Sequence, residues 1–270
     1  SFSGGVDSMF TLSRHRDSIT HLMMLNCFDE DGAVEPFEAV VEKAERFVIG
    51  QGKMLLPVTT NVRQVTEAEN IAWEYLHGPL LCTLAVSFGA DFYYIPGSNT
   101  TRELKPWGSH PLIDPLWATN TTGIEHEGLD VFRTEKTCAI AEDPVLLKNL
   151  QVCWNSKITN CGTCSKCART MLVLDELGIE DVPFPPFSRQ DIIQRLGVVS
   201  DAAVSHIWDL WNFMKKRGNQ ETATLLRKRI DTYLLKRSRE AFIKALIGKR
   251  AQALYHKWRG SGWRTRRVII

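Results

Sequence analysis

The sequence predicts an α/β fold with a parallel sheet over its first 180 residues, followed by an α-helical C-terminal region. Three observations predict this. Short apolar runs alternate with stretches of helical periodicity in the first half of the chain. Four cysteines lie close together between positions 153 and 167. Beyond the proline-rich segment 182–187, only helical patterns remain. We therefore expect two domains, residues 1–180 and 188–270.

The first half of the chain reads as repeated strand and helix units. The apolar runs 19–28, 53–59 and 91–95 predict strands, and helices are expected from Met9 and over 34–49, 62–76 and 80–88. Strands that alternate with helices of this length form parallel sheets. Ligands of such sheets bind beyond the carboxyl ends of the strands. The opening residues, Asn26–Cys27 and the segment after Ile95 should therefore border one crevice.

The second half of the chain begins with an irregular stretch. Residues 98–128 are rich in Thr, Asn, Pro and Gly, and a loop of this length in a compact domain is typical of a functional segment or of a mobile surface loop. A short strand is expected over 129–133 and a helix from Thr134. The C-terminal region predicts helices over 189–196, 201–217, 219–236 and 238–258.

Composition excludes several classes of protein. With 44% hydrophobic and 24% charged residues, the chain can form a core and is not a disordered polymer. No apolar run approaches the ~20 residues of a membrane span. The seven cysteines are an odd number, and the crowding of four of them favours a metal site over disulfides and predicts a reducing, cytoplasmic location.

Charge is distributed unevenly along the chain. Residues 215–270 carry a net charge of +14, whereas the rest of the chain carries −12. A basic tail of this kind predicts either an anionic partner, such as nucleic acid or an acidic protein, or docking of the tail on its own acidic body.

The first eight residues predict an anion site. Two adjacent glycines, Gly4 and Gly5, allow close approach of the backbone to a ligand, and Asp7 and Ser8 fall where a helix begins. A helix N-terminus with unpaired N–H groups favours phosphate. The plainer alternative is a glycine-rich turn that caps an ordinary helix. The chain starts inside this motif, so we expect that a strand leading into it has been trimmed.

The cysteine cluster predicts a structural metal site. Cys153, Cys161, Cys164 and Cys167 follow the pattern C-x7-C-G-x-C-x-x-C. Four thiolates complete the tetrahedral shell of Zn²⁺ and leave no position for substrate. An iron–sulfur cluster also takes four cysteines and stays open at this point, as do free core cysteines.

These motifs carry a family resemblance. Ser3-Gly4-Gly5-Val6-Asp7-Ser8 resembles the Ser-Gly-Gly-x-Asp-Ser signature of the PP-loop ATP pyrophosphatase superfamily, with all five fixed positions present. Together with the cysteine cluster about 150 residues later, it resembles the 7-cyano-7-deazaguanine synthase family over residues 1–178. Gly78-Pro79-Leu80-Leu81, the helix that contains Lys136, and Arg169 after the last cysteine add to the likeness. The substrate loop of that family differs from residues 99–111 here, and the helical tail lies outside the resemblance.

The resemblance implies a fold and a chemistry. The fold would be Rossmann-like, of the adenine nucleotide alpha hydrolase type, with a four-cysteine zinc knot. The enzyme would be an ATP-dependent ligase that uses ATP and Mg²⁺, joins AMP to an acidic or amide acceptor and releases pyrophosphate, before a nitrogen nucleophile attacks. Positioning and charge stabilisation are most of such catalysis.

The resemblance and the residues together give a set of candidate roles. Phosphate contacts are expected from Ser3, Gly4, Gly5 and Ser8. Asp7 would cap the helix or help to hold the metal, and Lys136 would place positive charge near the α-phosphate or lie solvated at the surface. Arg102, Lys105 and His110 are candidates for holding an acidic acceptor. The catalytic set is then Asp7, Lys136 and Arg102, and Asn26, Cys27 and Gly97 would border the nucleotide.

Three alternatives stay open. Cys27 is the leftover cysteine nearest the crevice, and loss of activity in Cys27→Ser would favour a sulfur nucleophile. The segment 258–267 interleaves Trp with Arg, which is typical of stacking on nucleic-acid bases, so the acceptor could be a base in tRNA or DNA. A non-catalytic nucleotide sensor is the third alternative. A homodimer is also among the expected assemblies.

Overall fold

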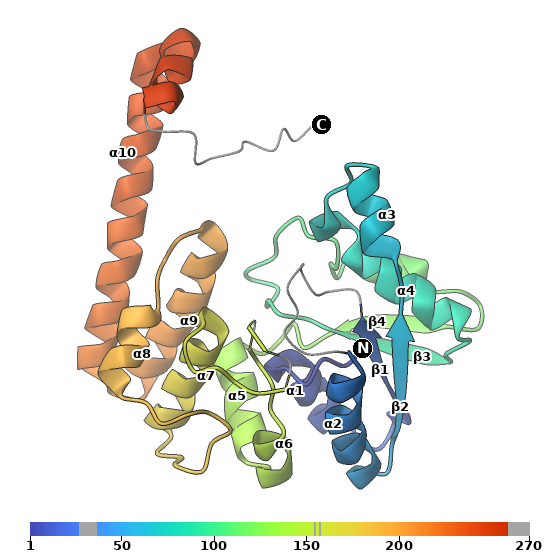
Figure 1. Ribbon diagram of the computed structural model, residues 1–270. Helices are drawn as coiled ribbons and strands as arrows, with labels where there is room; N and C mark the ends of the chain where they lie inside the picture. The colour runs from blue at the N-terminus through green and yellow to red at the C-terminus, as the bar shows by residue number, and fades with distance from the viewer. Residues whose placement is uncertain (27–36, 154, 157, 259–270) are drawn as a thin grey trace.

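The N-terminal half of the protein alternates short strands with helices (Figure 1). The computed structural model describes residues 1–26, 37–153, 155, 156 and 158–258, without the side chains of 202, 242 and 244–258. In chain order the elements of this half are α1 (Val6–Arg14), β1 (His21–Asn26), α2 (Phe37–Gly50), β2 (Met54–Thr59), α3 (Val62–Ala68), the 3-10 helix η1 (Trp73–Tyr75), α4 (His77–Ser87), β3 (Phe92–Pro96), the 3-10 helix η2 (Asp114–Trp117) and β4 (Gly123–Glu127).

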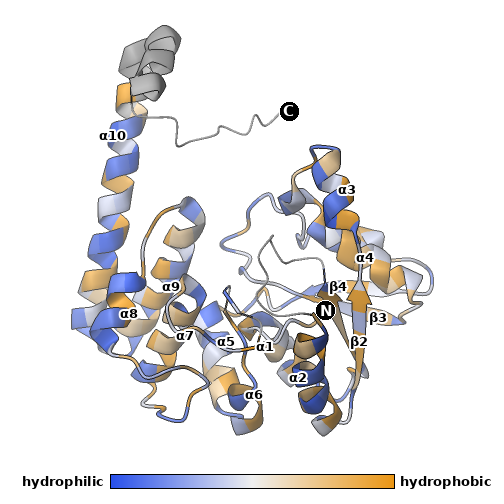
Figure 2. Cartoon of the chain, in the orientation of Figure 1, coloured by the Kyte–Doolittle hydropathy of each residue, from blue (hydrophilic) through white to orange (hydrophobic). Residues whose placement is uncertain are grey.

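The C-terminal half is helical in its described part. It contains α5 (Arg133–Ala141), α6 (Pro144–Lys148), α7 (Ser165–Glu176), α8 (Arg189–Arg195), α9 (Asp201–Lys216) and α10 (Gln220–Trp258). In Figure 1, α10 extends well beyond the other helices. Figure 2 shows hydrophobic residues along β2 and α4, whereas α10 alternates between hydrophilic and hydrophobic residues. None of the described helices has the length and apolar character needed to cross a membrane.

The described strands form two parallel pairs. β1 pairs with β2, with Met23 opposite Leu56, and β3 pairs with β4, with Tyr94 opposite Glu125. The first two residues of the chain lie between the pairs. The N-terminal amine of Ser1 donates to the carbonyl of Tyr94 at 2.7 Å, and the N–H of Phe2 donates to the carbonyl of Met23 at 2.8 Å. Backbone hydrogen bonds of this short segment therefore reach both pairs.

The β1–β2 pair is covered on both faces, as expected for parallel strands. Side chains alternate along β1: Leu22 and Met24 belong to the larger hydrophobic core, whereas Met23 and Leu25 pack with α4 and β3. Successive side chains of a strand point to opposite faces, so this division follows directly from the apolar run.

The larger core joins the two halves of the chain. It is a single cluster that includes Phe2 and Val6 near the N-terminus, Met171 on α7, Leu210 on α9 and Ile230 on α10. α9 packs against α10 and also against α5. The helices after residue 188 therefore share the core of the α/β part.

Four expected elements differ from the structure. The helix expected over 62–76 ends at Ala68, and the 3-10 helix η1 follows it. The strand expected at 129–133 lies instead at 123–127, because Gly128 (φ +80°) ends the strand and Arg133 already begins α5. This strand escaped detection because its buried Glu127 interrupts the apolar pattern. α4 begins at His77, since a proline within the first turn of a helix needs no N–H partner. The two helices expected over 219–258 are one continuous helix, α10.

Candidate functional site

The glycine loop, residues 3–8, forms a compact turn at the start of α1. Gly4 has φ +72°, a conformation that favours glycine, and its carbonyl accepts the N–H of Gln151 at 2.8 Å. The hydroxyl of Ser8 donates to the carbonyl of Gly5 at 3.1 Å and lies 3.3 Å from the hydroxyl of Ser3. The two hydroxyls and the first N–H groups of the helix are thus gathered at one helix terminus, an arrangement that favours an anion.

The end of β3 meets this loop. The hydroxyl of Ser98 donates to Asp7 Oδ2 at 3.2 Å, and the N–H of Gly97 donates to the carbonyl of Glu127 at 2.8 Å. Asn26 ends β1 as a partly buried residue paired with Thr59. Cys27, predicted beside it, lies outside the described residues. The predicted juxtaposition of the glycine loop with the end of β3 is therefore present.

Two cations of α5 face Asp7. The guanidinium of Arg133 donates to Asp7 Oδ2, and Lys136 Nζ lies 3.8 Å from Asp7 Oδ1. The side chain of Lys136 is 1% exposed, and its ammonium donates to the carbonyl of Gly97 at 2.7 Å. Lys136 is therefore a buried member of the site and not a solvated surface lysine.

The charges at this position alter each other's titration. Burial alone would raise the pKa of Asp7, but Arg133 and Lys136 outweigh it and hold that pKa below its ordinary value. Burial lowers the pKa of Lys136, an effect that Asp7 opposes. Asp7 Oδ1 is buried and accepts no hydrogen bond from the described residues. The loop thus presents a carboxylate that two cations face, and its Oδ1 accepts no hydrogen bond from the described residues.

α9 supplies a wall of this region. Asp209 accepts two hydrogen bonds from Thr134 in the first turn of α5, from its N–H at 3.0 Å and from its hydroxyl at 2.7 Å. Lys105 Nζ donates to the hydroxyl of Ser205 at 3.0 Å. These contacts attach both the start of α5 and the loop after β3 to the C-terminal region.

The buried ionisable groups around α9 have shifted pKa values. Burial, followed by the charges of Arg169 and Arg133, lowers the pKa of His206 to about 3. Burial raises the pKa of Asp209 to about 6. Arg169, on α7, has one guanidinium nitrogen that is buried without a partner among the described residues. The environment is therefore cationic and poorly solvated, which strengthens its attraction for an anion.

The three candidates for holding an acidic acceptor are placed differently. Lys105 and His110 line a cavity beside the end of β3. Arg102 is exposed, and its side chain makes no contact with the glycine loop among the described interactions. Its predicted catalytic role gains no support from these contacts and stays a prediction.

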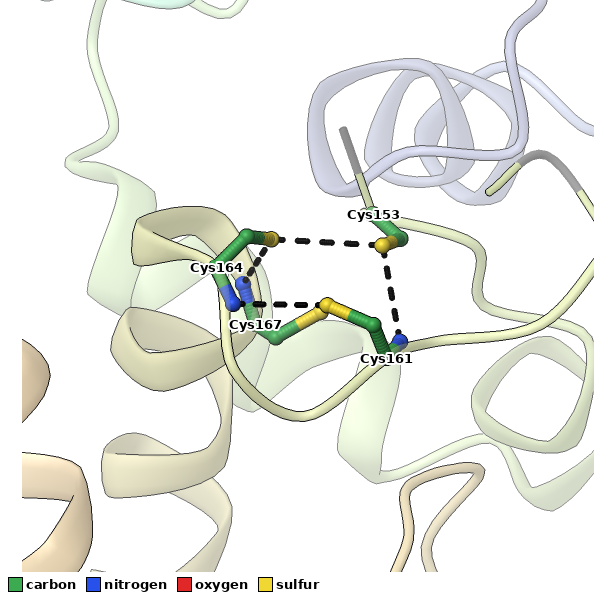
Figure 3. Close-up of side chains that lie close together, drawn as sticks. All are labelled: Cys153, Cys161, Cys164 and Cys167. Atoms are coloured by element: carbon green, nitrogen blue, oxygen red, sulfur yellow. Dashed lines mark hydrogen bonds between the residues drawn. The ribbon is translucent and has the colours of Figure 1, made fainter. Parts of the chain in front are cut away.

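The four cysteines of the cluster lie together, as predicted (Figure 3). Their four Sγ atoms all lie within 4.8 Å of one another, and Cys153 Sγ is 4.0 Å from Cys164 Sγ. Tetrahedral zinc with Zn–S bonds of ~2.3 Å needs sulfur separations of about 3.8 Å. This donor set and spacing therefore fit a metal ion such as Zn²⁺, held in a structural site.

Backbone donors prepare the sulfurs for metal. The N–H groups of Thr163 and Cys164 each donate to Cys161 Sγ at 3.3 Å, and the N–H of Cys161 donates to Cys153 Sγ at 3.4 Å. Burial raises the pKa of Cys161, but the hydroxyl of Thr163, which donates to Cys161 Sγ at 3.3 Å, and the N–H groups of Thr163 and Cys164 outweigh it and hold the pKa below its ordinary value. Metals bind the thiolate form, so these donors favour ligation by Cys161, whereas burial raises the pKa of the Cys153 thiol.

The cysteine cluster is connected to the glycine loop. Gln151, two residues before Cys153, donates its N–H to Gly4, and its side-chain oxygen accepts from Lys43 Nζ at 3.2 Å. The amide of Asn160 donates to the carbonyls of Leu150 and Pro183, at 2.8 and 2.9 Å. The cluster therefore supports both the glycine loop and the segment that leads to the C-terminal helices.

The sequence patterns did not identify several residues of the site. Arg133 was assigned to a strand, although its i, i+3 spacing from Lys136 could have placed both on one helix face. His126, Asp114 and Asp209 carry no local signal, because their partners lie on other elements.

Comparisons with protein-family models, with curated proteins and with solved structures found no match for this chain. The resemblance to the PP-loop enzymes accordingly rests on the motif residues alone.

Proposed function

We propose that the protein is an ATP-dependent adenylating enzyme of the PP-loop type, which cleaves ATP between the α and β phosphates and transfers AMP to an acceptor. The observation that carries this proposal is the placement of Asp7, Lys136 and Arg133 around the glycine loop. A helix N-terminus and two cations stabilise the negative charge of the phosphates. A reaction catalysed by such charge stabilisation does not need a nucleophile from the protein.

The residues of the glycine loop and of α5 would have separate roles in binding ATP. Ser3, Ser8 and the first N–H groups of α1 would hold the pyrophosphate part of ATP, and Lys136 and Arg133 would offset its charge. Asp7 has a buried, unbonded Oδ1, which fits Mg²⁺, since this ion is usually held by one or two carboxylates together with substrate phosphates. Mg²⁺ would supply charge neutralisation on the departing pyrophosphate. The cysteine cluster would hold Zn²⁺ in a structural role.

We infer that the two strand pairs belong to one Rossmann-like sheet, in which the first residues act as the middle strand. The hydrogen bonds of Ser1 to Tyr94 and of Phe2 to Met23 support this order, β2, β1, residues 1–2, β3 and β4. The glycine loop then follows the central strand, where ligands of open parallel sheets bind. Thiolate ligands for metal also favour a reducing, cytoplasmic location.

The described part of the basic tail favours docking on the body of the protein. Arg237 pairs with Asp201 at 2.7 Å, Lys216 with Glu135 at 3.6 Å, and Arg227 lies over the rings of Trp208 and Trp211. These groups are engaged within the chain, so no observation favours the nucleic-acid alternative. Residues 259–267 of the predicted Trp- and Arg-rich segment lie outside the described residues, and the homodimer stays a prediction.

Binding and cleavage of ATP test the proposal. Affinity is measured by calorimetry with the α,β-methylene analogue of ATP and Mg²⁺, and products are followed with α-labelled ATP. We expect Lys136→Met to weaken analogue binding about 10–100-fold, because a charged hydrogen-bond donor is lost. Lys148→Met, at an exposed lysine of α6, is the matched control and should bind normally.

The products decide between the alternatives. AMP and pyrophosphate support the proposal, and ADP with phosphate would refute it. Analogue binding that equals the wild type in Lys136→Met would also refute it. Tight binding without cleavage, in the presence of candidate acids and amides, would favour the nucleotide sensor.

A further inference from the structure

α9 packs against α5, the helix that carries the two cations of the site. Ile207 and Leu210 anchor α9 in the larger hydrophobic core, and each is 2% exposed. Asp209 lies between these two residues in the sequence and is also buried. A buried carboxylate needs hydrogen-bond donors around it. The donors of Asp209 come from the first turn of α5, beside Arg133 and Lys136.

Asp209 caps α5 from outside that helix. The first N–H groups of a helix have no partner within it, and a side-chain oxygen of the N-cap residue usually accepts one of them. The N-cap residue of α5 is Phe132, whose side chain has no oxygen. The N–H of Thr134 donates instead to Asp209 Oδ2 at 3.0 Å, and the hydroxyl of Thr134 donates to Asp209 Oδ1 at 2.7 Å. Both residues are buried, so α9 supplies the cap of α5.

The capped residue adjoins both cations that face the glycine loop. Arg133 precedes Thr134 and donates to Asp7. Lys136 follows in the same turn of the helix, donates to the carbonyl of Gly97 at 2.7 Å and lies 3.8 Å from Asp7 Oδ1. Helix ends fray when their caps are lost. Loss of the cap would therefore loosen both cations from the glycine loop.

We propose that Asp209 is a positioning residue for nucleotide binding, which holds Arg133 and Lys136 against the glycine loop through its hydrogen bonds with Thr134. The C-terminal helical region is then part of the nucleotide site. This inference rests on the proposed function for the identity of the ligand. The charge of Asp209 acts in the opposite direction, because a carboxylate near these cations weakens their attraction for phosphate. Removal of the carboxylate therefore separates a positioning effect from a charge effect, since the two change the affinity with opposite signs.

Binding of the α,β-methylene analogue of ATP with Mg²⁺, measured by calorimetry, tests this role. Asp209→Ala removes both acceptors, and we expect about 5–10-fold weaker binding, because the first turn of α5 must then be ordered when the ligand binds. Thr134→Val removes only the hydroxyl and should weaken binding about 2–3-fold.

Asp209→Asn is the conservative variant that should rescue binding. Its amide oxygen can accept the N–H of Thr134, and its amide nitrogen can donate to the hydroxyl of Thr134, because a hydroxyl group both donates and accepts. We expect this variant to bind the analogue within about twofold of the wild type, since both hydrogen bonds are kept.

Asp143→Ala is the matched control. Asp143 caps α6 with the same chemistry, and its carboxylate accepts the N–H groups of Val145 at 2.9 Å and of Leu146 at 3.1 Å. No residue of α6 belongs to the site described above. This variant should lower the free energy of unfolding, as the loss of a cap does, and should bind the analogue with the affinity of the wild type.

A measurement without nucleotide separates this role from the proposed function. The ¹⁵N signal of the Lys136 ammonium group, assigned with Lys136→Met, reports the surroundings of this buried cation. The signal should shift in Asp209→Ala and Thr134→Val and stay in place in Asp209→Asn and Asp143→Ala. This pattern in a protein that binds no ATP analogue would overturn only the proposed function.

The positioning role would be overturned by an unmoved Lys136 signal in Asp209→Ala. Where the wild type binds the analogue, equal or tighter binding by Asp209→Ala would also overturn it, as would binding by Asp209→Asn as weak as that of Asp209→Ala. An equal loss of affinity in Asp143→Ala would attribute the effect to general destabilisation and likewise overturn the role. If Asp209→Ala does not fold, Thr134→Val takes its place in each comparison.

Discussion

Asp209 gives a prediction whose size follows from the structure. This carboxyl group of α9 is 7% exposed, and burial raises its pKa to about 6. The ordinary value for aspartate is about 3.9, so the folded protein holds this proton more tightly by about 2 pKa units, or about 3 kcal/mol. The stability that protonation contributes is present below pH ~4 and is lost as the pH rises through 6.

Asp209→Asn removes this titration and keeps an acceptor for Thr134. The difference in free energy of unfolding between the wild type and the variant should therefore fall as the pH rises. Of the full effect of about 3 kcal/mol, roughly 2 kcal/mol should be lost between pH 4.5 and 8. Urea unfolding followed by circular dichroism, at constant ionic strength, measures both proteins across this range. Taking the difference between the two proteins removes the contributions of the other titrating groups to the pH dependence. A difference that stays constant with pH would refute the argument that Asp209 is buried with a raised pKa.

Three further predictions concern the metal cluster and two glycines. Cys164→Ser, or a chelator, should lower the midpoint of thermal unfolding and weaken binding of the ATP analogue, and unchanged binding would contradict the link between cluster and loop. Gly128→Ala should cost about 1–3 kcal/mol in urea unfolding, because the residue has φ +80° and its Cβ would lie 2.8 Å from Lys136 Nζ. Gly50→Ala, at an open position in α2, is the control and should be neutral or stabilising. Gly78→Ala should clearly lower the free energy of unfolding in urea, because its Cβ would lie 2.1 Å from the carbonyl oxygen of Gly108, and unchanged stability would show that α4 and the loop at Gly108 are not held in contact.

Local patterns predicted much of the fold. The apolar runs at β1, β2 and β3 identified their strands, and helical patterns identified α2, α8 and α9. β4 was misplaced because its Glu127 is buried through hydrogen bonds with Thr11 and Arg14 on α1, and no local pattern encodes partners more than 110 residues away.

The candidate site was predictable to the extent that its residues form motifs. The cysteine spacing and the glycine loop predicted groups of side chains that the structure brings together. His126 and Asp114 are 12 residues apart, on β4 and η2, and their pairing depends on how the intervening turn folds back. Arg102 is exposed, and its expected role, which rested on its charge and its place in the loop, stays a prediction.

The bond between Gln151 and Gly4 bears on the order in which the protein matures. During synthesis the N-terminal segment emerges first and can fold before the rest of the chain. The glycine loop, however, is completed by a backbone donor made almost 150 residues later, next to the cysteine cluster. A nascent chain that stops short of this donor would carry the whole loop sequence without the contact that holds it. The glycine loop is therefore completed late in the assembly of the molecule, although its residues are made well before Gln151 and the cysteine cluster.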